Sequence, residues 1–252
     1  MRAVILAALF AVCAFAQDPP PGWLSYATAS CPAGTRITSF SGDWDVLDSP
    51  NPSSAFYSPW IGMDPADNLN LLQPVNPWLG SGWSFYTEYY QWSPTYNSNS
   101  NQVQTNSRNH LHGSINYNGD AQQSYTINQK DVTANTQSSQ TIPVQRNNMG
   151  QYKNYTILYV VFEKVAYCQD YPPSEQITFR NLTVECNGVP FTPTWTTSYV
   201  EDVCDFRAHV VDPKTITMTW TTAGKSDAAK VEAQYALNDK LRANMKLRVP
   251  KH

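Results

Sequence analysis

The sequence has little charge and, past its first residues, no long apolar run. Asp, Glu, Lys and Arg make up 15% of its 252 residues, well below the roughly 25% of ordinary globular proteins. Residues 17–224 carry 9 basic against 17 acidic side chains, and this acidic balance argues against a nucleic-acid partner. No stretch after residue 16 approaches about 18 consecutive apolar residues, so no membrane span is predicted.

Residues 1–16 are typical of a secretory signal peptide. Arg2 gives the segment a positive start, residues 3–15 are apolar, and a small-residue Ala-Phe-Ala pattern precedes Gln17. We therefore expect a secreted, extracellular protein whose mature chain begins near Gln17.

Cysteine is scarce, and four cysteines remain once the predicted signal peptide is set aside. In an oxidising compartment these four allow two disulfides with three possible connectivities, among which closeness in sequence favours Cys186 with Cys204. Their spacing fits no zinc pattern, so no metal site is expected. The four are Cys31, Cys168, Cys186 and Cys204. Sequons at Asn154 and Asn181 are compatible with glycosylation on the same secretory route.

Short runs of aromatic and β-branched residues, broken by Gly, Pro, Asn and Ser, predict one all-β domain over residues 17–224. The polar tract 97–151 keeps strand-like alternation and an Asn-Gly turn signal, so it is expected to form ordered strands. The clearest predicted strands are 84–92, 110–117, 124–129, 156–165, 176–184 and 215–221.

The last segment, residues 225–252, is basic and has a different pattern. Val231 and Tyr235 recur at helical spacing, so one C-terminal α-helix is predicted, with Ser226 as its cap. We expect a solvated helix packed loosely on the sandwich, with contact to a membrane surface or an anionic polymer as the alternative.

Three motifs follow one another between residues 60 and 94. Trp60-Ile61-Gly62-Met63-Asp64 comes first, then Leu71-Leu72-Gln73, then Glu88-Tyr89-Tyr90-Gln91-Trp92-Ser93-Pro94. Their order resembles that of the glutamic peptidases, or eqolisins, which have a W-[IV]-G-[IL]-D segment, a catalytic Gln in [IL]-[IL]-Q-x-G, and a W-Y-E-W-Y-P strand. A later A-E-W-I-V-E strand brings their catalytic Glu. The resemblance covers residues 55–185 and implies a concanavalin-like jelly-roll sandwich of two antiparallel sheets, with substrate across one concave face.

Carried over by position, the resemblance puts the catalytic Gln on Gln73, where it would stabilise an oxyanion. It aligns the glutamate of the W-Y-E-W-Y-P strand with Gln91, and it aligns the catalytic Glu of the later strand with Leu158. Leucine accepts no proton, so the general base is missing. Glu163 would replace it only after a register shift of five residues, which reverses the face. The expected binding groove is lined by Trp60, Asp64, Tyr89, Gln91 and Trp92.

Three functions remain open on these grounds. The first is a catalytically degenerate sandwich that binds an extended polymer, either a peptide or a matrix component. The second is an active acid glutamic endopeptidase that uses Gln73 with Glu163 or another carboxylate. The third is a lectin-like module that binds a glycan by aromatic stacking, on a platform of Tyr86, Tyr90, Trp92 and Tyr96. No cofactor is expected, since the sequence contains no phosphate-binding loop, dinucleotide fingerprint or nucleophile elbow.

Overall fold

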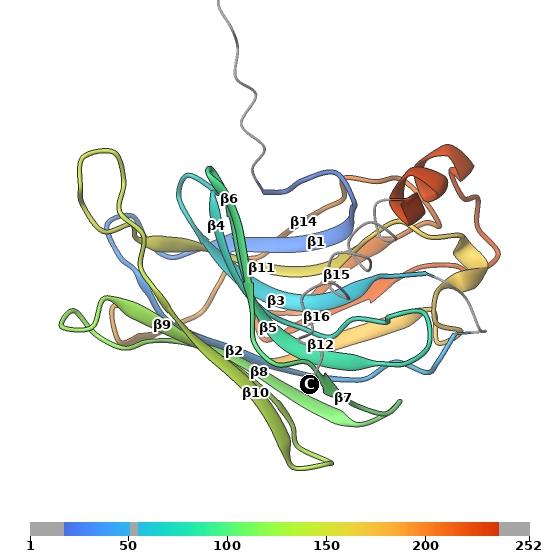
Figure 1. Cartoon of the computed structure of the whole chain (residues 1–252), viewed down its shortest axis with the longest axis horizontal. Coiled ribbons are helices and arrows are strands. Elements are labelled where there is room, and N and C mark those ends of the chain that lie inside the picture. The colour runs from blue at the N-terminus through green and yellow to red at the C-terminus, as the bar shows by residue number, and fades with distance from the viewer. Residues whose placement is uncertain (1–17, 51–54, 237–252) are drawn as a thin grey trace, which may run out of the picture.

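The computed structural model describes residues 18–50 and 55–236. The predicted signal peptide and the second half of the predicted C-terminal helix lie outside the described residues. Two antiparallel sheets of eight strands each are packed face to face in the described part of the chain (Figure 1), which confirms the predicted all-β sandwich. None of the helical segments in residues 18–50 and 55–236 is long and apolar enough to span a membrane.

The first sheet, here called sheet A, has the order β14-β1-β11-β3-β4-β5-β6, with β7 paired to β5. Its strands are β1 (Trp23–Ser30), β3 (Ser58–Pro65), β4 (Asn70–Val75), β5 (Ser84–Trp92), β6 (Thr95–Asn99), β7 (Val103–Gln104), β11 (Tyr155–Glu163) and β14 (Thr196–Ser198).

The second sheet, sheet B, has the order β10-β9-β8-β2-β12-β16-β15, with β13 paired to β12. Its strands are β2 (Ile37–Asp45), β8 (His110–Tyr117), β9 (Ser124–Asp131), β10 (Thr136–Pro143), β12 (Gln176–Cys186), β13 (Val189–Phe191), β15 (Arg207–Asp212) and β16 (Thr215–Thr219). One 3₁₀ turn, η1 (Cys168–Asp170), follows β11.

The predicted strands agree closely with those observed. Residues 84–92 and 110–117 match β5 and β8 residue for residue, and the other four differ at their ends by at most two residues. The polar tract forms most of β6 and all of β7, β8, β9 and β10, as expected. Alternation of side chains was therefore a sufficient signal even where the composition was rich in Asn, Gln, Ser and Thr.

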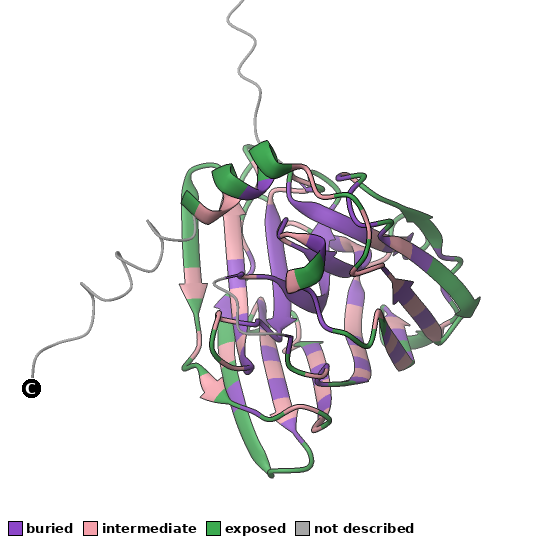
Figure 2. Cartoon of the chain, turned by 90° about the vertical axis from the view of Figure 1, so that its right-hand side faces the viewer, coloured by how far each residue is buried: buried purple, intermediate pink, exposed green. Residues whose placement is uncertain are grey.

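Apolar side chains gather on both faces of sheet A. The main core lies between the two sheets. A second cluster, formed by Trp23, Trp60, Leu71, Val75, Tyr159 and Val161, lies on the opposite side of sheet A, which we call its outer face. As a result every residue of β3 and β4 is buried, whereas buried and partly exposed residues alternate along strands of sheet B such as β9. Figure 2 shows both kinds of strand, the first in continuous purple and the second in purple and pink bands.

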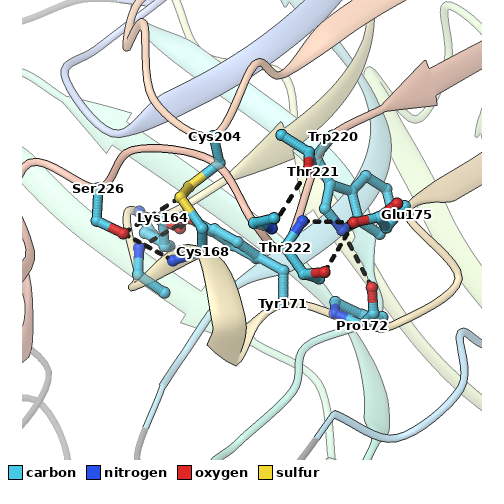
Figure 3. The surroundings of a disulfide bond; sticks show 12 residues. Lys164, Cys168, Tyr171, Pro172, Glu175, Cys204, Trp220, Thr221, Thr222 and Ser226 are labelled. Carbon is cyan, nitrogen blue, oxygen red and sulfur yellow. Dashed lines mark hydrogen bonds between the residues drawn. A yellow bond between two sulfur atoms is a disulfide. The ribbon is translucent and has the colours of Figure 1, made fainter.

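All four cysteines are oxidised as predicted, but the favoured pair Cys186–Cys204 is wrong. One disulfide joins Cys31 to Cys186. The other joins Cys168 to Cys204 (Figure 3). Cys186 is the last residue of β12 and lies opposite Ile37, the first residue of β2. Cys31 directly follows the last residue of β1, and the two cysteines meet there. Proximity in sequence was misleading because the chain leaves β12 to form β13 and β14 before it reaches Cys204.

The C-terminal helix is present from residue 228 to the last described residue, 236. Asp227 caps it, because the Lys230 amide donates to Asp227 Oδ1 at 3.2 Å; the prediction of Ser226 as the cap is wrong. Ser226 Oγ instead accepts a hydrogen bond from the Cys168 amide at 2.8 Å (Figure 3). The described turns pack firmly, since Val231 is fully buried and Tyr235 donates to Asp170 Oδ2 at 2.8 Å.

Candidate active site

One row of residues crosses four strands of sheet A on its outer face. On β11 and β3, Tyr159 lies opposite Gly62. Met63 lies opposite Leu72, so the next position brings Gly62 opposite Gln73, and Gln73 lies opposite Glu88 on β5. Side chains two residues apart share a face, so Gln73 faces the same way as Leu71 and Val75 of the outer cluster.

Gly62 places no side chain in the middle of this row. A Cβ there would lie 2.9 Å from the Leu72 carbonyl and 2.9 Å from the Trp60 ring, so no side chain fits. Two strand spacings put the Cα atoms of Tyr159 and Gln73 roughly 10 Å apart. Side chains at these two positions therefore project on either side of a residue that has none, over which the Trp60 ring and Leu71 pack.

Gln73 and Glu88 form a direct pair. Gln73 is 4% exposed, and its Nε2 donates to Glu88 Oε2 at 3.0 Å. Asn97 of β6 donates to the other Glu88 oxygen. Burial raises the pKa of Glu88 to about 7, and the charge of Glu163 adds to this rise, so protonated and ionised Glu88 are comparably populated near neutrality.

Glu163 lies at the end of β11 on the same outer face, within electrostatic range of Glu88. It accepts a hydrogen bond from Ser58 Oγ at 3.2 Å and pairs with Lys164 Nζ at 3.4 Å. Burial alone would lower the pKa of Lys164, but the neighbouring Glu163 and Glu88 carboxylates raise it above its ordinary value. The outer face thus carries two carboxylates and one ammonium near Gln73.

Leu158 does not occupy the catalytic position that its alignment implied. It is fully buried in the core between the sheets, opposite Met63, and points away from Gln73. The family strand A-E-W-I-V-E has two glutamates four residues apart, which must share a face. If the second is placed on Glu163, the first falls on Tyr159, in the same row as Gln73. Glu163 therefore shares the outer face with Gln73, which corrects the expectation that it lies on the wrong face, and Tyr159 is the β11 residue in the row of Gln73.

The β5 residue beside Gln73 is Glu88, and not Gln91 as the resemblance implied. Gln91 lies on the other face of β5, where its Oε1 accepts from Tyr89 Oη at 2.6 Å. Counting the W-Y-E-W-Y-P pattern from Glu88 puts aromatic residues, Tyr86 and Tyr89, on its two tryptophans. This agreement was the signal in the sequence that would have identified Glu88.

The predicted groove residues divide between the two faces. Trp60, Asp64 and Trp92 belong to the outer face, where Trp60 packs edge-on against Trp23 with ring centroids 5.0 Å apart. Tyr89 and Gln91 belong to the inner face, so the structure does not bring them to the other three.

Metal chemistry finds no support in the side chains of residues 18–50 and 55–236. They include no cluster of three or more His, Cys, Asp or Glu residues arranged to hold an ion. The chemistry available at the row is therefore that of an amide, carboxyl groups and a phenol.

Comparison of the two-sheet sandwich with solved structures supports a glutamic-peptidase-like fold. Scytalido-glutamic peptidase, solved with a transition state analog inhibitor, is 16% identical with a TM-score of 0.58, over 79% of this chain and 98% of that chain. SCP-B, a member of the eqolisin family of peptidases solved with the tripeptide Ala-Ile-His, is 14% identical with a TM-score of 0.55, over the same shares. No family model and no curated protein matches the sequence.

Proposed function

We propose that this chain is a secreted, catalytically inactive protein with a glutamic-peptidase-like fold, which binds an extended peptide across the outer face of sheet A. The single observation that carries the proposal is the row Tyr159, Gly62, Gln73. A peptidase of this design needs a carboxylate across the row from the glutamine to activate water and to protonate the leaving amine. A tyrosine there supplies neither function at acidic pH.

Tyr159 is also committed to packing. It is 4% exposed, and its ring lies edge-on to Trp23 at 5.0 Å. Burial raises its pKa further above the ordinary tyrosine value, so the phenol stays protonated. What remains of the machinery is the oxyanion-type glutamine and the aromatic surface, which suit binding better than hydrolysis.

The active-peptidase alternative has one observation in its favour, the Gln73–Glu88 pair. However, Glu88 contacts Gln73 directly and its second oxygen is taken by Asn97. No room is left between amide and carboxylate for a water and a carbonyl, and for this reason we place Glu88 as a residue that orients Gln73.

A peptide partner is favoured over a glycan because the predicted aromatic platform is divided. Tyr90 packs edge-on against Trp92 on the outer face, with ring centroids 4.6 Å apart. Tyr96 instead lies near Tyr89 on the other side of the sheet, with ring centroids 6.1 Å apart. Secretion is supported by the two disulfides, which persist in oxidising compartments.

The test is digestion of a denatured protein between about pH 2 and 5, where carboxyl-based peptidases have both acid and base forms. We expect no cleavage by the parent protein and a measurable gain from Tyr159→Glu, because general acid-base assistance contributes about 10² to 10⁴ in rate. Adding Gln73→Ala to Tyr159→Glu should abolish that gain. Robust cleavage by the parent that disappears in Gln73→Ala would overturn the proposal.

Leu158→Glu is the matched control, one residue away on the opposite face. A carboxylate in the sealed core costs several kcal/mol, so this variant should unfold rather than gain activity. Binding is tested separately by selecting from a displayed library of extended peptides on the parent protein. Selected peptides should bind more weakly to Tyr90→Ala, whose side chain lies half-buried on the outer face.

A further inference from the structure

The first described residues form a strap along the outer face of sheet A. The strap, residues 18–22, has the sequence Asp-Pro-Pro-Pro-Gly. Its Asp18 amide donates to the Asn68 carbonyl in the β3–β4 turn at 3.2 Å. At its other end the Gly22 carbonyl accepts from the Lys164 amide at 2.6 Å, beyond the end of β11. In Figure 1 this segment, in blue, passes above β1 and then turns back into it.

The strap holds an acidic side chain in a buried position. Asp18 is 1% exposed and Asp64 of β3 is fully buried. Both side-chain oxygens of Asp18, Oδ2 of Asp64 and Nε1 of Trp92 are enclosed and have no well-aligned hydrogen-bond partner. Asp18 faces Asp64 and Trp92 within hydrogen-bonding reach. One proton changes this for the two carboxyls, because a protonated carboxyl donates to the other, and the Trp92 indole N–H, a donor at every pH, favours the ionised form of Asp18.

Other charged and titratable groups face the pair from every neighbouring element. The Lys164 ammonium favours ionisation of Asp18, whereas the Glu163 carboxylate disfavours it. The groups in electrostatic contact are Glu163 and Lys164 at the end of β11, Tyr159 on β11, Tyr90 on β5, and Asp67 in the β3–β4 turn, which acts on Asp64.

We propose that the strap is an intramolecular ligand of the peptide-binding face, and that Asp64 and Trp92 form a carboxylic-acid subsite that holds it only while the two carboxyls share a proton. The subsite would take the same chemistry from another chain, namely an extended, proline-rich peptide with a protonated acidic side chain. This inference rests on the proposed function, because it names what the outer face binds and when.

The direction of the pH effect follows from the pair. Burial raises the pKa of Asp18 from its ordinary value near 4 to about 6, and it raises that of Asp64 as well. Asp64 is the member of the pair that keeps the shared proton, because its hydrogen bond to Asp18 adds to the effect of burial on its pKa. The stabilisation of the closed strap is therefore retained through about pH 6, where Asp18 ionises, and is lost only as the pH rises through the higher pKa of Asp64. Each unit by which closure raises the pKa of Asp64 corresponds to a tenfold change in the open-to-closed ratio.

The experiment is a pH titration of the secreted full chain, labelled with ¹⁵N and followed by NMR. The Trp92 indole N–H, identified by its loss in Trp92→Phe, should shift with a midpoint above pH 6, where Asp64 loses the shared proton. The exchange protection of the Gly22 amide, which donates to Glu201 Oε1 at 3.2 Å, should fall over the same range, by about tenfold for each unit by which closure raises the pKa of Asp64. Absence of both transitions in the parent protein would overturn the inference.

Two substitutions at Asp18 sharpen the result. Asp18→Asn should hold the strap closed and remove the transition, because an amide donates to the Asp64 carboxylate without a proton being taken up. Asp18→Ala should leave the strap open even in acid, and a strap that stays protected there would refute the subsite. Asp67→Asn is the matched control, since Asp67 is 42% exposed and pairs with Lys153 at 2.8 Å; it should keep the transition.

Failure of this inference and failure of the proposed function are separable. A parent protein that cleaves substrate but retains the pH transition loses only the proposed inactivity. A parent protein that neither cleaves nor shows the transition keeps the proposed function and loses the strap.

Discussion

The Cys31–Cys186 disulfide should contribute more stability than any other single covalent feature of the described fold. Cys31 follows β1 of sheet A and Cys186 ends β12 of sheet B, so the bond fixes one sheet to the other. It spans 155 residues of sequence. On the chain-entropy model, closing a loop of this length removes about 5 kcal/mol of conformational free energy from the unfolded state.

The Cys168–Cys204 disulfide provides the internal comparison. It spans 36 residues, for which the same model gives about 4 kcal/mol. Replacing both cysteines of one bond by alanine should therefore destabilise the protein by roughly 1.3 kcal/mol more for the longer loop than for the shorter. Both double variants leave cavities of similar size, because all four cysteines are nearly or fully buried.

The assay is urea unfolding followed by tryptophan fluorescence, with the free energy of unfolding extrapolated to water for the parent and both double variants. Mass mapping without reduction should first find the two linked peptide pairs and no free thiol. A linked Cys186–Cys204 peptide would refute the connectivity. A larger loss of stability from the 36-residue loop would refute the entropic reasoning, and would mean that native packing around Cys168 dominates.

Three further predictions concern the surroundings of the site and the surface. Gly62→Ala should cost about 1 to 3 kcal/mol in the free energy of unfolding, because its Cβ would meet the Leu72 carbonyl at 2.9 Å. Burial alone would raise the pKa of Asp131, but hydrogen bonds from hydroxyl, amide and backbone groups lower it. Asp131→Asn should therefore destabilise by about 1 to 3 kcal/mol at neutral pH, and the gap in urea midpoints should close as the pH falls below about 4. Asn154 and Asn181 are both exposed, so each sequon substitution to Gln should remove one glycan mass from the secreted protein; unchanged mass would show an unoccupied site.

Strand identity was readable from the sequence because it depends on local alternation. A half-buried strand needs apolar side chains at every second position, and this pattern is present in the runs that became β5 and β8. The glutamine at position 73 and its preceding apolar residues were also recognisable, since a short motif on one strand keeps its own spacing. The even count of cysteines predicted full oxidation for the same kind of reason, one of chemistry and not of position.

Which face of the sheet each side chain points to depends on strand register. Register is set by pairing between strands that are far apart in the sequence. A shift of one residue exchanges the two faces, and it is this step that separates Leu158 in the core from Tyr159 in the row with Gln73. The same difference put Glu88, and not Gln91, beside Gln73.

Composition and local pattern thus determined that this chain forms a β-sandwich with an amide-bearing strand and oxidised cysteines. Only the tertiary structure decided which cysteines meet, which residue faces Gln73 across Gly62, and that Asp18 lies buried against Asp64. The physical reason is that antiparallel pairing joins β1, β11, β3, β4 and β5 across most of the chain length. Contacts of that range are fixed by the packing of both sheets together, and no single segment of sequence encodes them.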